Sequence, residues 1–135
     1  MILAEGLSAI FNEFDFTDSI ISEIKWENNF FDLAITMDYY WDIQEGKETT
    51  RLLKLLFKDV MKADFQTNKM LANLPKSEIH PDSWYTIVRL SEETNNVFIK
   101  EENLLDFKSI QIFTYDHFTP LLAVVFREIV IVEAV

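Results

Sequence analysis

The 135-residue sequence contains no cysteine and only two glycines, Gly6 and Gly46. Without cysteine, a disulfide scaffold, a thiolate zinc site and a cysteine nucleophile are excluded. Two glycines are too few for the glycine-rich loops that hold phosphate groups, which excludes the two common kinds of nucleotide-binding enzyme. No apolar run approaches the roughly 18 residues of a membrane-spanning helix. Glu5 interrupts the stretch that would have to serve as a secretory signal. We therefore expect a cytoplasmic protein.

Basic residues are also scarce. Lysine and arginine number 12 against 23 acidic residues, which gives a net charge of −11 and a pI of about 4.5. This balance argues against nucleic acid or an anionic membrane as the main partner. Apolar residues make up 49% of the chain, which is ordinary for a globular protein. The length predicts a single domain over residues 1–135.

Alternation of apolar and polar residues predicts an antiparallel sheet. Residues 20–26 alternate and are followed by Asn28-Asn29, two residues that tolerate the positive φ of a hairpin turn. The return strand over residues 31–41 alternates most clearly, and its core-facing set is Phe31, Leu33, Ile35, Met37, Tyr39 and Trp41. Residues 51–62 fit either a strand or a helix. We favour a strand, because the second strand of the hairpin needs a partner.

The other segments are expected to supply one helix and further strands. Residues 2–14 place apolar side chains at helical spacing, which predicts a short amphipathic helix. Polar connections are expected at 42–49 and 67–82, with a helical turn at 68–74, and strands at 84–90, 97–100, 107–115 and 121–132. The predicted fold is mainly β (α+β): an antiparallel β-sandwich or strongly curved sheet of about seven to eight strands with one short N-terminal helix.

The acidic residues are unevenly distributed. Residues 1–50 carry a net charge of −9, residues 51–76 carry +4, and residues 77–135 carry −6. Two predicted turns concentrate carboxylates: Asp38, Asp42, Glu45 and Glu48 at one, and Glu92, Glu93, Glu101 and Glu102 at the other. If the two turns lie at the same end of the sheet, they form a negative surface that speeds association with a basic partner. Alternatively, these residues only keep a small protein soluble.

Aromatic side chains accompany the first acidic turn. Alternation places Tyr39 and Trp41 with the core and leaves Tyr40 outside, so Tyr40 is a candidate interface anchor together with Trp84. The structural alternative is two core residues and one exposed tyrosine. An aromatic stripe of this kind could also line a ligand cavity.

The two histidines are weak candidates for catalysis. His80 and His117 each have an aspartate nearby, Asp82 and Asp116, but both histidines border a proline turn, where imidazoles are usually solvated. The carboxylates are so numerous that pairs of them arise by chance. We therefore predict no catalytic residue, no metal and no cofactor.

Residues 15–60 contain, in order, Asp18-Ser19-x-Ile21, Ile24, the asparagine-rich turn, the strand FFDLAITMDYYW and the run LLKLLFKDV. This order resembles a pattern found in small bacterial immunity proteins of polymorphic toxin systems. Such proteins are encoded beside toxins and neutralise them by binding. The resemblance implies a non-enzymatic cytoplasmic protein, and it assigns no binding residue, because such interfaces differ from one toxin to the next.

These observations give three hypotheses of function. The first is an immunity-type inhibitor whose carboxylates pair with a basic protein partner, with Tyr40 or Trp84 as the apolar anchor. The second is a carrier of a small apolar ligand, with an aromatic-lined cavity between sheet and helix. The third is a hydrolase or isomerase that uses a histidine. A homodimer stays open, because the basic segment 51–76 could face an acidic patch of a second copy.

Overall fold

A computed structural model of the protein describes residues 1–67, 73–78, 85–114 and 118–134. Within these residues nine strands form two antiparallel sheets that do not close into a barrel. The five-stranded sheet has the order β1-β9-β4-β3-β2 and the four-stranded sheet the order β5-β8-β7-β6. The strands are β1 (Ile2–Glu5), β2 (Ile20–Glu27), β3 (Asp32–Tyr39), β4 (Arg51–Lys58), β5 (Lys62–Phe65), β6 (Arg89–Glu92), β7 (Lys108–Phe113), β8 (Leu122–Phe126) and β9 (Glu128–Glu133). The predicted mainly β fold is confirmed.

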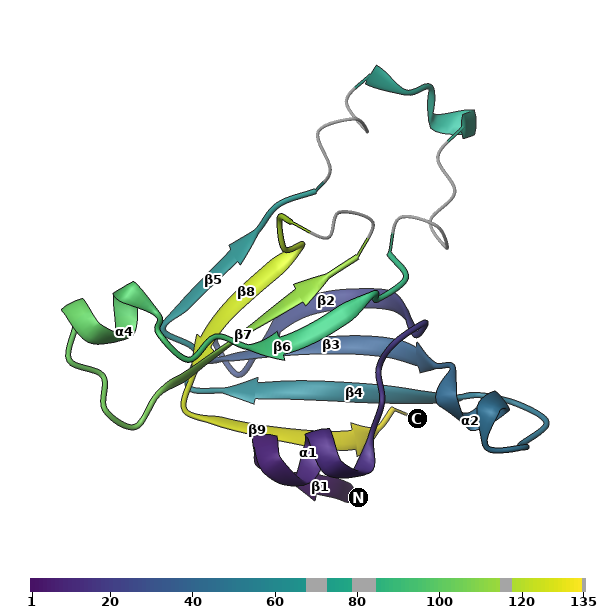
Figure 1. Ribbon diagram of the computed structural model, residues 1–135, viewed down its shortest axis with the longest axis horizontal. Helices are drawn as coiled ribbons and strands as arrows, with labels where there is room; N and C mark the ends of the chain where they lie inside the picture. The colour runs from purple at the N-terminus through teal and green to yellow at the C-terminus, as the bar shows by residue number, and fades with distance from the viewer. Residues whose placement is uncertain (68–72, 79–84, 115–117, 135) are drawn as a thin grey trace.

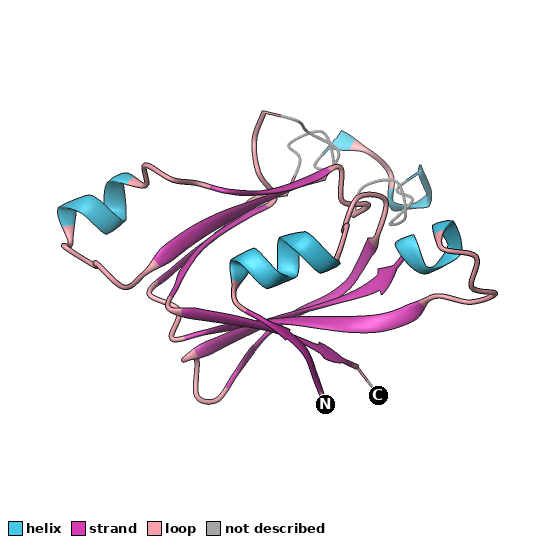
Figure 2. Ribbon diagram, turned by 60° about the horizontal axis from the view of Figure 1, so that its bottom comes forward, coloured by secondary structure: helices cyan, strands magenta, loops and turns pink. Residues whose placement is uncertain are grey.

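Short helices complete the described part of the chain. They are α1 (Leu7–Glu13), α2 (Trp41–Gln44) and α4 (Val97–Glu101), with a 3-10 turn η2 (Lys76–Glu78). In Figure 2 the two sheets are separate, splayed layers, and α1 lies between them. Leu7 and Ile10 are the buried residues of α1 and belong to the common core. None of the described helices is long and apolar enough to cross a membrane.

One core joins the two sheets. Alternation along β3 and β4 buries one face of each strand, and its members are all at most 2% exposed: Leu33, Ile35 and Met37 on β3, and Leu53, Leu55 and Phe57 on β4. The two sheets touch where the Phe57 ring of β4 meets the Phe126 ring of β8, with centroids 5.0 Å apart. Rings packed at this separation combine apolar burial with favourable aromatic geometry. The core therefore fixes the relative position of the strand ends on which the candidate surfaces lie.

The hairpin predicted from alternation is confirmed. Strands β2 and β3 pair through the connection 28–31, in which Asn28 and Asn29 have φ of 52° and 57°. Strand β4 pairs beside β3, so the strand interpretation of residues 51–58 is confirmed and the helical alternative is wrong. The ends of the predicted strand 31–41 are corrected. Phe31 is 60% exposed in the turn, and Trp41 begins α2.

The N-terminal prediction is half wrong. Residues 2–5 form β1, which pairs antiparallel with β9, and only Leu7–Glu13 are helical. Gly6 separates the two elements with φ of +84°, a conformation that glycine adopts without strain and that a continuous helix does not allow. The apolar residues whose spacing predicted one helix belong to two elements, the short edge strand β1 and the helix α1.

Two C-terminal predictions also need correction. The predicted strand 97–100 is the helix α4, because Asn96 caps it by accepting a hydrogen bond from the Ile99 N–H at 2.9 Å. The predicted strand 121–132 is two strands, β8 and β9, in different sheets. Arg127 is the corner between them, and its N–H donates to the Lys58 carbonyl at 3.0 Å. The segment after β4 forms a separate strand, β5, in the other sheet, whereas the sequence predicted no separate strand there.

Candidate functional site

The first acidic turn is built around a buried carboxylate. Asp42 in α2 is 0% exposed and accepts hydrogen bonds from the Arg51 N–H, the Arg51 guanidinium and Lys47, at 2.9–3.2 Å for the shortest bond of each group. Burial by itself would raise the pKa of Asp42, but the hydrogen bonds from Arg51 and Lys47 outweigh it and hold the pKa below its ordinary value. The expectation that Asp42 is an exposed binding residue is therefore wrong.

The remaining members of this turn lie at the surface. Glu45 and Glu48 are exposed, and Asp38 is half-buried and accepts a hydrogen bond from the Thr50 hydroxyl. Tyr40 is 37% exposed and its N–H donates to Ser19 Oγ at 3.1 Å. Among the residues that the structure describes, no cation forms an ion pair with Asp38, Glu45 or Glu48. The two nearby cations, Lys47 and Arg51, both bind Asp42 instead.

The buried ion pair also holds the turn against the core. The Arg51 guanidinium lies 5.8 Å from the centroid of the buried Tyr39 ring, which packs edge-on against Phe14 and Phe16. Desolvation of the Tyr39 hydroxyl raises its pKa, and the hydrogen bond that it accepts from the Asp15 N–H at 3.0 Å only partly opposes this. Tyr40 and the exposed glutamates thus lie on a segment that the contacts of Asp42, Arg51 and Tyr39 hold in place.

The second acidic turn surrounds α4. Glu92 lies exposed at the end of β6, and Glu101 and Glu102 are exposed at the end of α4. Glu93 is half-buried and accepts a hydrogen bond from Asn96 Nδ2 at 2.7 Å. Three of the four carboxylates are therefore open to a partner, and the fourth supports the residue that caps α4.

The structure places the two acidic turns at opposite ends of the strands. α2 precedes Arg51, the first residue of β4, whereas α4 precedes β7, whose Lys108 pairs with Phe126 beside the corner at Lys58, the last residue of β4. The eight residues of β4 span about 23 Å. Figure 1 shows α2 and α4 at the two sides of the molecule. The single negative surface that would have required both turns at one end does not form.

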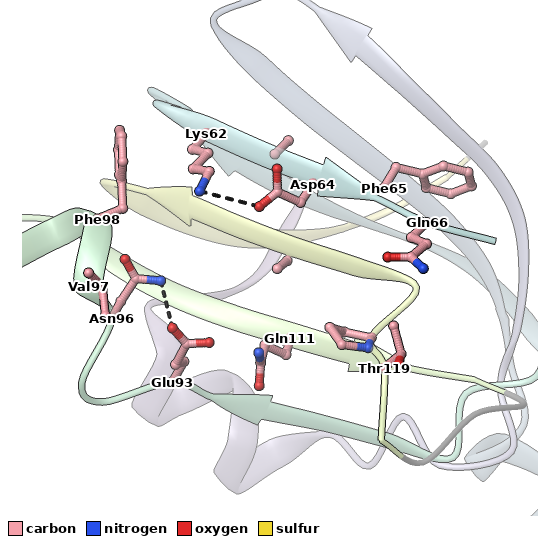
Figure 3. Close-up of a pocket in the computed structure, with 13 residues that line it drawn as sticks. Lys62, Asp64, Phe65, Gln66, Glu93, Asn96, Val97, Phe98, Gln111 and Thr119 are labelled. Atoms are coloured by element: carbon pink, nitrogen blue, oxygen red, sulfur yellow. Dashed lines mark hydrogen bonds and ion pairs between the residues drawn. The ribbon is translucent and has the colours of Figure 1, made fainter. Parts of the chain in front are cut away.

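A polar groove of about 760 Å³ lies on the outer face of the four-stranded sheet, beside α4. Figure 3 shows Lys62 reaching toward Asp64 on one wall and Asn96 toward Glu93 on the other, with Gln111 on the floor. The Lys62 Nζ to Asp64 carboxylate distance is 3.4 Å. Both wall carboxylates therefore already have a partner within the protein, and the groove presents mixed donors and acceptors suited to a polar chain segment.

The sequence did not predict β5 as a separate strand, so it did not place its residues in a groove. Residues 62–65 read Lys-Ala-Asp-Phe, an alternation of only four residues. Its period of two is the only local signal for a strand, and the polar context favours a loop. Asn96, by contrast, had a usable signal, because asparagine before a short apolar run is a common helix cap.

An apolar hollow of about 250 Å³ lies between the sheets at the side where β2 and β5 face each other. Its walls include Ile24, Trp26, Leu33, Phe65 and Leu122. The aromatic-lined cavity of the carrier hypothesis was expected between sheet and helix, and this hollow lies between two strand edges instead.

Three predicted candidates lie outside the described residues. They are Trp84, His80 and His117, together with Asp82 and Asp116. In the described ranges, no group of three histidine, aspartate or glutamate side chains is arranged to hold a metal ion.

No family model, curated protein or solved structure matches the chain.

Proposed function

We propose that this protein is a non-enzymatic binding protein, an immunity-type inhibitor that occludes a basic protein partner with the surface around α2. We define the α2 surface as Asp38, Tyr40, Ile43, Glu45 and Glu48. One observation carries the proposal: the two cations near this surface are both bound to the buried Asp42, so the exposed Glu45 and Glu48 form no ion pair with any residue that the structure describes. A surface with such an excess attracts lysine and arginine side chains of a partner.

Apolar side chains in the same surface support a protein partner rather than counterions alone. Tyr40 and Ile43 are 37% and 40% exposed and lie within the acidic residues. A tyrosine surrounded by charged groups is typical of an interface anchor, because its ring buries apolar area while its hydroxyl stays hydrogen-bonded. The ion pair between Asp42 and Arg51 orders this segment before binding, so less conformational entropy is lost when a partner binds.

The test is capture of a partner from the native host at low salt, with two matched variants. Glu45→Gln/Glu48→Gln removes two carboxylates from the α2 surface, and Glu101→Gln/Glu102→Gln removes two from α4. Both pairs are exposed, and both variants change the net charge by the same amount. We expect a stoichiometric basic protein whose capture falls about tenfold in the first variant and little in the second.

The inhibitor activity has its own measurement. The captured protein, expressed alone, should arrest growth, and co-expression of the wild type should relieve the arrest more fully than the Glu45→Gln/Glu48→Gln variant does. Equal loss of capture in both variants would place the interface elsewhere. A captured protein with no effect on growth would contradict the immunity-type activity.

The carrier function has one observation in its favour, the apolar hollow beside Trp26 and Phe65. Its volume of about 250 Å³ is below the range of about 300–1,000 Å³ that is usual for small-molecule sites. We expect hydrophobic compounds to shift the thermal unfolding midpoint only slightly, and a large shift would favour the carrier function over the inhibitor.

A further inference from the structure

Five large apolar side chains are exposed where β2 and its turn approach the start of β5. They form the aromatic edge, which consists of Trp26, Phe30, Phe31, Met61 and Phe65, each between 41% and 74% exposed. The Trp26 and Phe30 ring centroids are 6.0 Å apart, and Trp26 and Phe65 line the same hollow. The Phe31 carbonyl accepts a hydrogen bond from the Val60 N–H at 2.8 Å, next to Met61. The five residues are therefore neighbours in space from two separate segments.

The backbone at the centre of this edge is strained. Phe30 has φ of +70°, the left-handed conformation that bulky residues avoid, and its side chain is 74% exposed. Asn28 and Asn29 share the conformation, but asparagine tolerates it. Because the Phe30 side chain is mostly exposed, its burial within the chain does not offset the strain of its backbone. Strain of this kind, held at an exposed aromatic residue, points to a contact outside the chain.

The charges around the aromatic edge cancel within the protein. The ion-paired residues around the edge are four acidic and four basic: Glu23, Glu27, Asp59, Asp64, Lys25, Lys54, Lys62 and Arg127. Their ion pairs join Lys25 to Glu23 and Glu27, Lys54 to Glu27, Lys62 to Asp64, and Arg127 to Asp59, at 3.2–3.9 Å. This rim offers no net charge to a basic partner.

We infer that the aromatic edge is the interface through which two copies of this chain form a homodimer. A neutral rim around an apolar centre is complementary to itself, as the interface of a two-fold dimer must be. The five side chains expose roughly 500 Å² together, since aromatic residues carry about 150–250 Å² each. That is well over half of the roughly 800 Å² that each partner contributes to a standard interface.

A second copy can approach at this edge with less charge repulsion than elsewhere on the described surface, because the ion pairs of the rim neutralise each other. Each chain carries −11, so two copies repel each other wherever their unpaired carboxylates meet. The aromatic edge is a surface whose own charges sum to zero, so two copies can approach there at least cost. The homodimer should consequently strengthen as salt screens the remaining repulsion.

The test is sedimentation equilibrium of the full chain over a range of concentrations, at low and high salt. We expect a species of twice the 15.9 kDa chain mass that becomes more populated as salt rises. Phe30→Asn should raise the dissociation constant at least ~100-fold, because it removes a central aromatic contact. Asparagine suits the left-handed conformation, so this variant should keep its fold, and circular dichroism checks that it does.

A matched control is Leu105→Asn, which removes an apolar side chain that is 87% exposed in the loop after α4. Its dissociation constant should equal that of the wild type. Three outcomes overturn the inference: a monomer at every concentration and salt, a dimer that Phe30→Asn leaves intact, or a dimer that dissociates as salt rises. None of them affects the α2 surface, since Glu45 and Glu48 lie at the other end of β4 from the turn 28–31.

Discussion

The α2 surface and the aromatic edge use ion pairs in opposite ways. At α2, Lys47 and Arg51 both bind the buried Asp42, and in the described part of the chain no cation forms an ion pair with the exposed Glu45 or Glu48. At the aromatic edge, Lys25, Lys54 and Lys62 each bind an acidic neighbour, and the surface becomes neutral. Net charge alone does not distinguish these regions. We propose that this difference in pairing suits the α2 surface to a basic partner and the aromatic edge to a second copy.

The largest expected effect is at Asp42. Replacing it by alanine removes the acceptor of the Arg51 backbone N–H and guanidinium, and the Arg51 side chain is 31% exposed, so water can solvate part of it. Loss of this acceptor should therefore cost about 2 kcal/mol, less than the loss of one partner of a fully buried ion pair. Urea denaturation should show this loss in Asp42→Ala and much less in Glu45→Ala, since Glu45 is exposed. Equal losses would mean that Asp42 does not brace the turn.

The pH dependence of stability follows from the same carboxylate. The folded pKa of Asp42 lies below that of the unfolded chain, about 3.9, so its contribution is complete above that value and is lost as pH falls through the folded pKa. The difference in urea midpoint between the wild type and Asp42→Asn should be constant near neutrality and narrow in strong acid. A difference that grows on acidification would contradict the lowered pKa.

Phe30→Asn should change the free energy of unfolding less than Asp42→Ala does, and in the opposite direction. Relief of the left-handed strain should raise the free energy of unfolding by about 1 kcal/mol, measured at dilutions where the protein is monomeric. Phe31→Asn is the control, because Phe31 is exposed but does not have a positive φ. A gain in both variants would trace the effect to exposure of apolar surface rather than to the backbone.

The smallest effect is expected for the ion pairs of the rim. Lys25 is 53% exposed and reaches Glu23 and Glu27 only at 3.8 Å and 3.9 Å. Lys25→Ala should change the free energy of unfolding by less than about 0.5 kcal/mol, because exposed pairs gain little in water. Its measurable consequence is a weaker homodimer at low salt, since the rim loses its neutrality.

The local sequence pattern predicted β2, β3 and β4, but it did not predict the corner between β8 and β9 or the strand β5. Residues 20–27, 32–39 and 51–58 alternate because β3 is paired on both sides and one face of the sheet is buried, so the alternation predicts both register and burial. The position of Arg127, where β8 leaves one sheet and β9 enters the other, depends on contacts between distant segments. A continuous apolar run contains no signal for that corner, and β5 is too short to show a period.

The two candidate surfaces could also be predicted only in part from the sequence. The acidic residues near α2 were identifiable from their clustering, but the burial of Asp42 depends on Arg51, nine residues away across a loop. The aromatic edge unites residues 26–31 with 61–65, which the pairing of β3 with β4 and of β5 with β8 brings together. Phe30 followed two turn-forming asparagines in the sequence, yet its exposure could not be inferred from alternation.

The most direct test is the salt dependence of self-association, measured by sedimentation velocity on the wild type and Glu45→Gln/Glu48→Gln. We expect the wild-type dimer to increase between about 10 mM and about 0.5 M salt, as screening shortens the range of repulsion. The variant should dimerise more at low salt, because it lacks the two glutamates whose charge opposes association in the wild type. A dimer that dissolves in salt and is lost in the variant would show the α2 carboxylates binding a second copy, and would contradict the division between the two surfaces.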